Sequence, residues 1–171
     1  MITIRPLQLS DCTQEYADWL NDPEVNKYLE CRLMTHTVDS LRANLNALYE
    51  GTTDRPFAIL FDGKHIGNIK IGGVNGHHGY AELGYFIGNR AMWGRGYATQ
   101  AVKLATRHAF EEMNLFHLRA GFYRSNRASW RVLEKAGYEF MGFYRGQLRG
   151  PDGGREDHIF CEATSDMWSM K

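Results

Sequence analysis

Apolar residues fall in short runs over part of the chain and recur at helical spacing over the rest, so the pattern predicts both strands and helices. The short or alternating runs predict strands at residues 2–6, 55–61, 64–71, 79–87, 117–123, 139–145 and 155–161. Helical spacing predicts helices over much of 10–48, with breaks near Asn21 and over 31–37, then from Tyr97 to about 113 and from Asn126 to about 136. The predicted order is a strand, a helical segment, three strands, a helix, a strand, a helix and two strands.

Turn and cap residues define several of these boundaries. Asp62-Gly63 is typical of a tight turn, so the three strands between 55 and 87 are predicted to form an antiparallel meander. Asp22, which is followed by a proline and an acid, predicts the start of a helix, and Asn126 predicts the start of another. Gly137 predicts the end of that second helix, and the glycine-rich segment 150–154 predicts a hairpin turn between the last two strands.

The composition is that of one domain of ordinary size. With 171 residues the chain can bury a core without disulfides or metal, and we expect a single domain over 1–171. Its 20 basic and 20 acidic residues cancel, which argues against a nucleic-acid or membrane partner. Cys12, Cys31 and Cys161 lack C-x-x-C spacing, which favours free thiols. Since no segment has the layout of a signal peptide or membrane span, we expect a cytoplasmic protein.

A glycine-rich segment, 93–99, stands between a predicted strand and the helix that begins near Tyr97. Gly94 and Gly96 allow the backbone to turn sharply there. The free N–H groups of the first helical turn can then point at an anion, and the helix dipole adds positive potential. The segment therefore predicts a site for a phosphate or pyrophosphate group.

Two other phosphate-binding motifs fit this segment less well. Gly94-x-Gly96-x-x-Thr99 is close to the dinucleotide fingerprint G-x-G-x-x-G, but its third position is threonine. The strands before it form a meander instead of opening a parallel βαβ unit, and no acidic residue ends a second strand about twenty residues later. A P-loop is excluded because no Gly-Lys-Ser/Thr follows the glycines.

Several short segments together carry a resemblance to a known family. They lie at residues 4–7, 21–25, 81–87, 93–99, 126–129 and 133–138. On these segments the chain resembles the GNAT acyltransferase superfamily over nearly all of its length, and within it the RimJ/RimL branch, which acetylates protein N-terminal amines. The resemblance implies an α/β (α+β) architecture, the GNAT acyl-CoA N-acyltransferase fold: a mixed, mostly antiparallel central sheet with a splayed strand pair, flanked by helices.

The resemblance implies acetyl-CoA as cosubstrate. The family motif Gln/Arg-x-x-Gly-x-Gly/Ala falls on residues 93–98, with Trp93 in place of the usual polar residue. The N–H groups of this segment are expected to hold the pyrophosphate, and the edge of the splayed strand is expected to pair with the amides of the pantetheine arm. The residues expected to hold acetyl-CoA are Tyr85, Phe86, Ile87, Gly94, Arg95, Gly96, Tyr97, Ala98, Thr99 and Asn126.

Glu82 and Ser129 are the expected catalytic residues. The resemblance places Ser129 near the sulfur of acetyl-CoA. Leu133 stands where many other branches have a tyrosine acid, so a hydroxyl acid must come from Ser129 or from water. Strand alternation puts Glu82 on the same face as Gly84, beside the expected acyl group, which makes Glu82 the candidate base. The alternative for Glu82 is an exposed or salt-bridged surface carboxylate.

The acceptor site is expected beside the predicted helical segment that contains Tyr28 and Glu30, with Trp93 and Tyr144 as further residues that could line it. The adjacent His77 and His78 are expected in a loop beside the cleft. On a strand they would point to opposite faces, and no cysteine is spaced to join them, so no metal site is expected.

These expectations combine into one reaction: an acetyl group moves from acetyl-CoA to a primary amine, either a protein N-terminal α-amine or a small-molecule amine, by direct attack in a ternary complex. An attacking amine must be neutral. At pH 7 its deprotonation costs about 1 to 1.4 kcal/mol for an α-amine and about 4.6 kcal/mol for a lysine-like amine. The alternatives are an acetyltransferase for an amino sugar or polyamine, and a non-catalytic acyl-CoA-binding module. A homodimer stays open.

Overall fold

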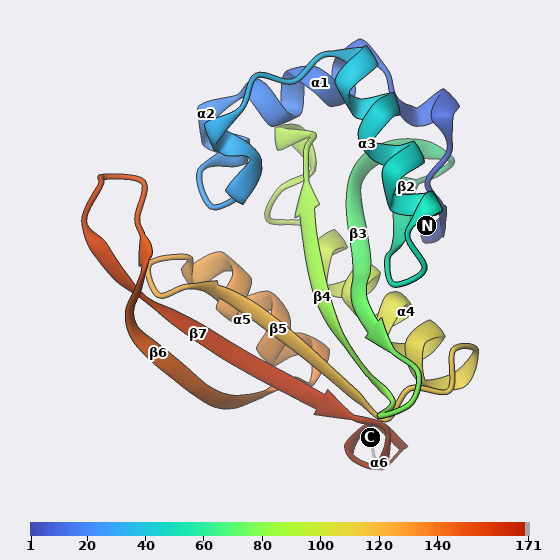
Figure 1. Ribbon diagram of the computed structural model, residues 1–171, viewed down its shortest axis with the longest axis vertical. Helices are drawn as coiled ribbons and strands as arrows, with labels where there is room; N and C mark the ends of the chain where they lie inside the picture. Colours follow the sequence, from blue (N-terminus) through green and yellow to red (C-terminus); the bar gives the residue numbers. More distant parts are fainter. Residues whose placement is uncertain (170–171) are drawn as a thin grey trace.

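The computed structural model describes residues 1–169 and is built around a seven-stranded sheet (Figure 1). Its order is β1-β2-β3-β4-β5-β7-β6, and only the β4–β5 pair is parallel. The strands are β1 (Ile2–Pro6), β2 (Arg55–Phe61), β3 (Lys64–Asn75), β4 (Tyr80–Ile87), β5 (His117–Tyr123), β6 (Glu139–Arg149) and β7 (Arg155–Thr164). The mixed, mostly antiparallel sheet confirms the expected fold class.

Helices cover both faces of the sheet. On one face lie α4 (Tyr97–Glu111) and α5 (Arg127–Ala136), and on the other α1 (Gln14–Asn21), α2 (Pro23–Asn26) and α3 (Val38–Glu50). A short α6 (Ser165–Ser169) follows β7, and three single turns of 3-10 helix complete the set: η1 (Leu9–Asp11), η2 (Glu30–Leu33) and η3 (Arg90–Met92).

Side chains of alternate residues in the strands feed two separate apolar cores. Ile59 of β2 belongs to the larger core under α4 and α5, whereas its neighbours Ala58 and Leu60 belong to the core under α1 and α3. On β4, Leu83 faces the larger core and Phe86 packs against the other. Both faces of the strands in the middle of the sheet are therefore covered over part of their length.

The predicted elements are confirmed, with differences at their ends. β3, β6 and β7 run several residues beyond the ranges predicted, because bulged or bent strands keep pairing after the alternation of residue types has ended. The helix predicted from Asp22 lasts a single turn, and α6 was not predicted. His77 and His78 lie in the β3–β4 turn, which confirms that they are loop residues, and the His78 ring stacks on the ring of Tyr80 at the start of β4, with the centroids 6.4 Å apart.

The parallel strands β4 and β5 part soon after they begin (Figure 1). They pair at Tyr80–His117, Ala81–Leu118 and Glu82–Arg119 and at no later residue, although β4 continues to Ile87 and β5 to Tyr123. This is the splayed strand pair that the family resemblance implies.

Candidate active site

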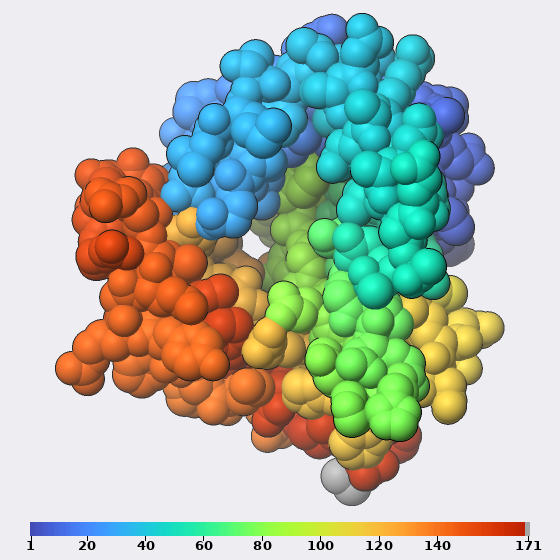
Figure 2. Space-filling model, viewed as in Figure 1, coloured from blue at the N-terminus to red at the C-terminus, as the bar shows by residue number. Residues whose placement is uncertain are grey.

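The parting of β4 and β5 leaves a strand edge open inside the sheet. Beyond Glu82, one edge of β4 is paired with β3 as far as Ile87, while the edge that faces β5 has no partner strand. Before Ile87, whose carbonyl oxygen accepts from the Trp93 indole, the backbone N–H and C=O groups along that edge can pair with a ligand that carries amide groups. Figure 2 shows the centre of the molecule hollowed here, between the blue N-terminal helices, the green strands and the gold and orange C-terminal strands.

The segment after β4 turns back into α4 through two glycines in the left-handed conformation. Gly94 has φ 72° and Gly96 has φ 76°, and a Cβ at either position would meet no atom within 4 Å. The first helical N–H that bonds back into the helix is that of Gln100, which donates to the Gly96 carbonyl oxygen at 3.1 Å. The N–H groups of residues 97–99 precede it and have no such acceptor, so they can bind an anion in the open space before the helix.

Trp93, the unusual residue of the glycine motif, braces this turn. Its indole Nε1 donates to the Ile87 carbonyl oxygen at 2.8 Å, which ties the end of β4 to the segment before α4. Arg95 likewise turns back, and its Nε donates to the Ala91 carbonyl oxygen at 3.0 Å. Trp93 is therefore part of the scaffold of the glycine turn.

A half-buried hydroxyl pair lies on the helix side of the open edge. The Tyr85 hydroxyl is 2.9 Å from the Ser129 Oγ and also donates to the Ser129 carbonyl oxygen at 3.3 Å. Asn126 holds Ser129 in place, because its Oδ1 accepts from the Ser129 N–H at 3.1 Å as the cap of α5. Desolvation raises the pKa of Tyr85, so this phenol stays protonated at neutral pH and can donate a proton toward Ser129.

The Tyr85 hydroxyl was missed by the sequence analysis, which considered only the backbone of that residue. Strand alternation could have indicated this hydroxyl. Residues three apart on a strand point to opposite faces, so if Glu82 faces one side of the sheet, Tyr85 carries its hydroxyl toward the helices on the other side. What the sequence cannot supply is that Ser129 meets this hydroxyl.

Glu82 lies on the opposite face of β4, in a shallow depression of about 290 Å³. The depression is lined by Tyr80, Ala81, Glu82, His117, Arg119 and Met141. The Glu82 carboxylate is ion-paired with the Arg119 guanidinium, from the residue opposite it in the strand pairing, and its side chain is 58% exposed. Arg119 is also held over the Phe160 ring, 5.0 Å from its centroid. Glu82 is therefore exposed and salt-bridged, as the alternative expectation has it, and it belongs to the last pair of residues before the strands part.

A bridge of side chains crosses the wide end of the opening. The Tyr123 hydroxyl, at the end of β5, donates to the Glu30 carboxylate and accepts from Arg32 Nη1 at 2.9 Å. Arg32 Nη2 donates to the Arg149 carbonyl oxygen, also at 2.9 Å. The bridge therefore joins η2 to β5 and to the end of β6.

Tyr28 joins this bridge through contacts with Ser125 and Tyr123. The Ser125 Oγ donates to the Tyr28 hydroxyl at 3.2 Å, and the rings of Tyr28 and Tyr123 lie 5.6 Å apart. Burial raises the pKa of Tyr123, and the hydrogen bond to Glu30 raises it further. Tyr28 and Glu30, expected at the acceptor site, are thus both held in contacts that span the opening.

Three general properties hold for the described residues. In residues 1–169, no group of three or more His, Cys, Asp or Glu side chains is placed to hold a metal ion. None of the helices described here has both the length and the apolar character needed to cross a membrane. Cys12, Cys31 and Cys161 are free.

Known proteins that are similar to this chain include several acetyltransferases. The chain is 28% identical over 149 residues to an uncharacterized N-acetyltransferase, p20, from Bacillus licheniformis, covering 84% of this chain and 82% of p20. Among solved structures, RimJ from Mycobacterium smegmatis in complex with CoA-disulfide superposes with a TM-score of 0.84 at 23% identity, covering 96% of this chain and 82% of that one.

A spermidine N-acetyltransferase from Vibrio cholerae, in complex with CoA and spermine, superposes with a TM-score of 0.87 at 19% identity and covers 98% of both chains. At these identities the two solved structures show a common fold. The family model for the acetyltransferase (GNAT) domain matches residues 1–139, which is most of the chain. The chain belongs to the GNAT family of acetyltransferases.

Proposed function

We propose that this protein moves the acetyl group of acetyl-CoA to a primary amine by direct attack in a ternary complex. The observation that carries the proposal is the parting of β4 and β5 after Glu82 and Arg119, which leaves an unpaired strand edge leading to the start of α4. The pantetheine arm carries amides that suit such an edge, and a pyrophosphate suits the free N–H groups beyond Gly96. Residues 85–87 and 94–99 would hold the cosubstrate, together with Asn126.

Ser129 is the proposed acid. When the amine nitrogen bonds to the acetyl carbon, the carbon–sulfur bond breaks and the departing thiolate takes a proton. Ser129 Oγ can give that proton and recover one from the Tyr85 hydroxyl, 2.9 Å away. The contact is short enough for a proton to pass between the two oxygens, and because desolvation raises the pKa of Tyr85 this phenol holds a proton to give.

Glu82 is the proposed base, and Arg119 controls its availability. The carboxylate lies on the face of β4 away from Ser129, so an amine approaching through the depression meets Glu82 while the thioester is held along the strand edge. In the free protein Arg119 occupies the carboxylate. An acceptor, or a water between it and the carboxylate, must displace part of that contact before the amine proton can move to Glu82.

The favoured acceptor is an α-amine. A single carboxylate acting through water suits an amine whose deprotonation at pH 7 costs about 1 to 1.4 kcal/mol better than one that costs about 4.6 kcal/mol. A polyamine is the second candidate, because the Vibrio cholerae relative was solved with spermine. Two carboxylates, Glu30 and Glu156, also lie near the wide end of the gap between β4 and β5.

The test is a panel of acceptors with purified protein and acetyl-CoA. Release of free CoA is measured with peptides bearing a free N-terminus, the same peptides with a blocked N-terminus, spermidine, and an amino sugar. We expect the free peptides to give the highest kcat/KM and the blocked peptides none. Highest turnover with spermidine would replace the α-amine by the polyamine. Tight CoA binding without turnover on any amine would support the non-catalytic module.

A further inference from the structure

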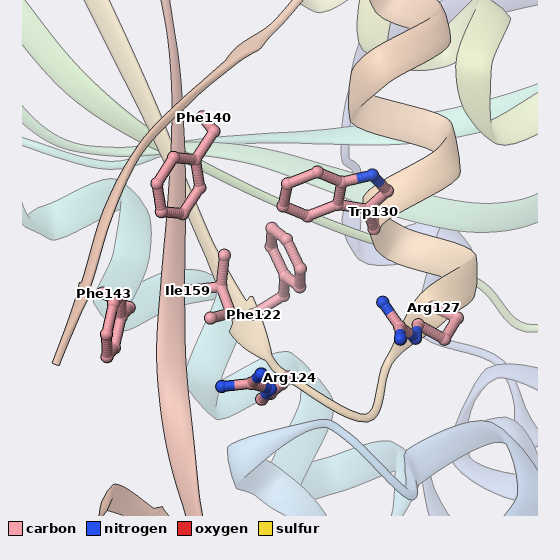
Figure 3. A pocket seen from close by; sticks show the side chains of 7 residues that line it. All are labelled: Phe122, Arg124, Arg127, Trp130, Phe140, Phe143 and Ile159. Atoms are coloured by element: carbon pink, nitrogen blue, oxygen red, sulfur yellow. The ribbon is translucent and has the colours of Figure 1, made fainter. Parts of the chain in front are cut away.

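His158 of β7 lies on the face of the sheet that carries Glu82. The next residue, Ile159, faces the α5 side, where it lines a groove of about 230 Å³ together with Phe122 of β5 (Figure 3). Neighbouring residues of a strand point to opposite faces, so His158 and Gly121 lie on the other face. His158 therefore belongs to the side of the sheet from which the amine is proposed to approach.

The edge of the His158 ring lies against Gly121, beside the opening between β4 and β5. A Cβ at residue 121 would clash with His158 Nε2, and a glycine inside a strand often marks such a close approach. Gly121 comes two residues after Arg119, the last residue of β5 that pairs with β4, so Nε2 lies where the strands have parted. On the β4 side of the opening, a Cβ at Gly84 would meet no atom within 4 Å.

A hydrogen bond determines which ring nitrogen of His158 carries the hydrogen. His158 Nδ1 is 2.8 Å from Gln147 Oε1, an amide oxygen that can only accept, so Nδ1 is the donor and Nε2 carries a lone pair. The ring packs against Phe160, with the centroids 4.1 Å apart, and Tyr123 and Tyr144 lie opposite it on β5 and β6. Within residues 1–169 no group forms a hydrogen bond with Nε2. Nε2 is thus a free acceptor beside the opening.

Charged groups from three other elements act on His158. Burial lowers the pKa of His158, and the Arg119 guanidinium on β5 acts in the same direction. The carboxylates of Glu82, on β4, and Glu30, on η2, raise it, but the pKa stays below its usual value. The imidazole is therefore neutral at neutral pH, and once it takes up a proton the two carboxylates stabilise its charge.

We propose that His158 Nε2 is a second proton acceptor for the attacking amine, used while Arg119 occupies the Glu82 carboxylate. The inference rests on the proposed acetyl transfer. As the nitrogen bonds to the acetyl carbon, an N–H bond breaks and its proton passes to the Nε2 lone pair, directly or through one water, while the electron pair stays on the nitrogen. The imidazolium then releases the proton to water through the opening, which returns His158 to its neutral form.

His158→Asn tests the proposal in the full chain, with acetyl-CoA and a peptide that has a free N-terminus. The asparagine amide nitrogen can still donate to Gln147, but the acceptor at Nε2 is lost. We expect kcat/KM for the amine to fall by up to about 10²- to 10⁴-fold, with an unchanged dissociation constant for CoA. In the wild type both the amine and His158 must lose a proton, so kcat/KM should fall more steeply toward low pH than in the variant, where only the amine titrates. A purely structural role would not change this slope.

His108→Asn is the matched control. His108 is also a partly buried histidine whose ring packs against a phenylalanine, Phe57, with the centroids 5.1 Å apart, but it lies in the last turn of α4. It should keep the wild-type kcat/KM and pH profile. An active wild type with unchanged kcat/KM in His158→Asn, or equal losses in both variants, would overturn this inference alone. A wild type without turnover on any amine would overturn the proposed function and this inference with it.

Gln147→Glu provides a second readout at an exposed position, where the substitution should not affect folding. A carboxylate beside Nδ1 raises the pKa of His158, so the fall of kcat/KM on the acid side should begin at a higher pH than in the wild type. A pH profile that does not move would overturn the proposal, including in the case where His158→Asn does not fold.

Discussion

Replacing Gly96 by valine tests whether the start of α4 holds the pyrophosphate. Gly96 has φ 76° and a Cβ there would meet no atom within 4 Å, so the cost within the protein comes from the backbone conformation. That cost is roughly 1–2 kcal/mol for an L-residue in the left-handed region. In a chain of this length it corresponds to a fall in Tm of about 2–8 °C. The variant should therefore remain folded at 25 °C.

Gly96→Val should lose more CoA affinity than its small loss of stability would cause by itself. The valine side chain occupies the open space in front of the free N–H groups of residues 97–99. A hydrogen bond to a charged group contributes about 1.5–3 kcal/mol, so the loss of one such bond weakens binding by roughly 10- to 150-fold. Isothermal titration calorimetry with CoA measures the change directly.

Gly63→Val is the matched control for this experiment. Gly63 has φ 81°, also with no atom within 4 Å of a Cβ, but it lies in the turn between β2 and β3. It should lose a similar amount of stability and keep the wild-type affinity for CoA. If the two folded variants bind CoA equally well, the pyrophosphate does not sit at the start of α4.

Four further substitutions test the proposed acid and base. Ser129→Ala and Tyr85→Phe both remove the 2.9 Å hydroxyl contact. Each should lower kcat by up to about 10²- to 10⁴-fold, with little change in KM for acetyl-CoA. A wild-type kcat in Ser129→Ala would leave this serine a role only in the structure of α5. Glu82→Gln should lose most kcat/KM at low pH and recover part of it as the pH rises toward the pKa of the amine. Arg119→Gln, which frees the Glu82 carboxylate, should alter the same pH profile without changing CoA affinity. A Glu82→Gln pH profile that superimposes on that of the wild type would make this carboxylate structural.

The elements could be predicted from the sequence because their signals are local. Asp22 caps α2 through a 2.9 Å bond to the Glu24 N–H, and Asn126 caps α5 in the same way. Gly137 ends α5 with φ 94°, in the left-handed conformation. Each of these depends on residues a few positions apart, which the sequence shows directly.

The contacts of the candidate site depend on register and tertiary packing, which the sequence does not show. Arg119 meets Glu82 because β4 and β5 pair in one particular register, 37 residues apart in the chain. Tyr123 meets Glu30 and Arg32 across more than 90 residues. The roles of Glu82, Ser129 and the glycine turn remain predictions. The structure adds the residues that contact each of them, which any test of these roles must take into account.

Under the proposed function, the parted strands would give the two substrates separate entrances. The glycine turn leads into α4 on one face of the sheet, whereas the depression at Glu82 opens on the other. The sheet then acts as a partition, and occupancy of one entrance does not block the other. Initial rates should give intersecting double-reciprocal lines, and a non-reactive CoA analogue should compete with acetyl-CoA but not with the amine. With two entrances, the acetylated amine can leave while CoA is still bound.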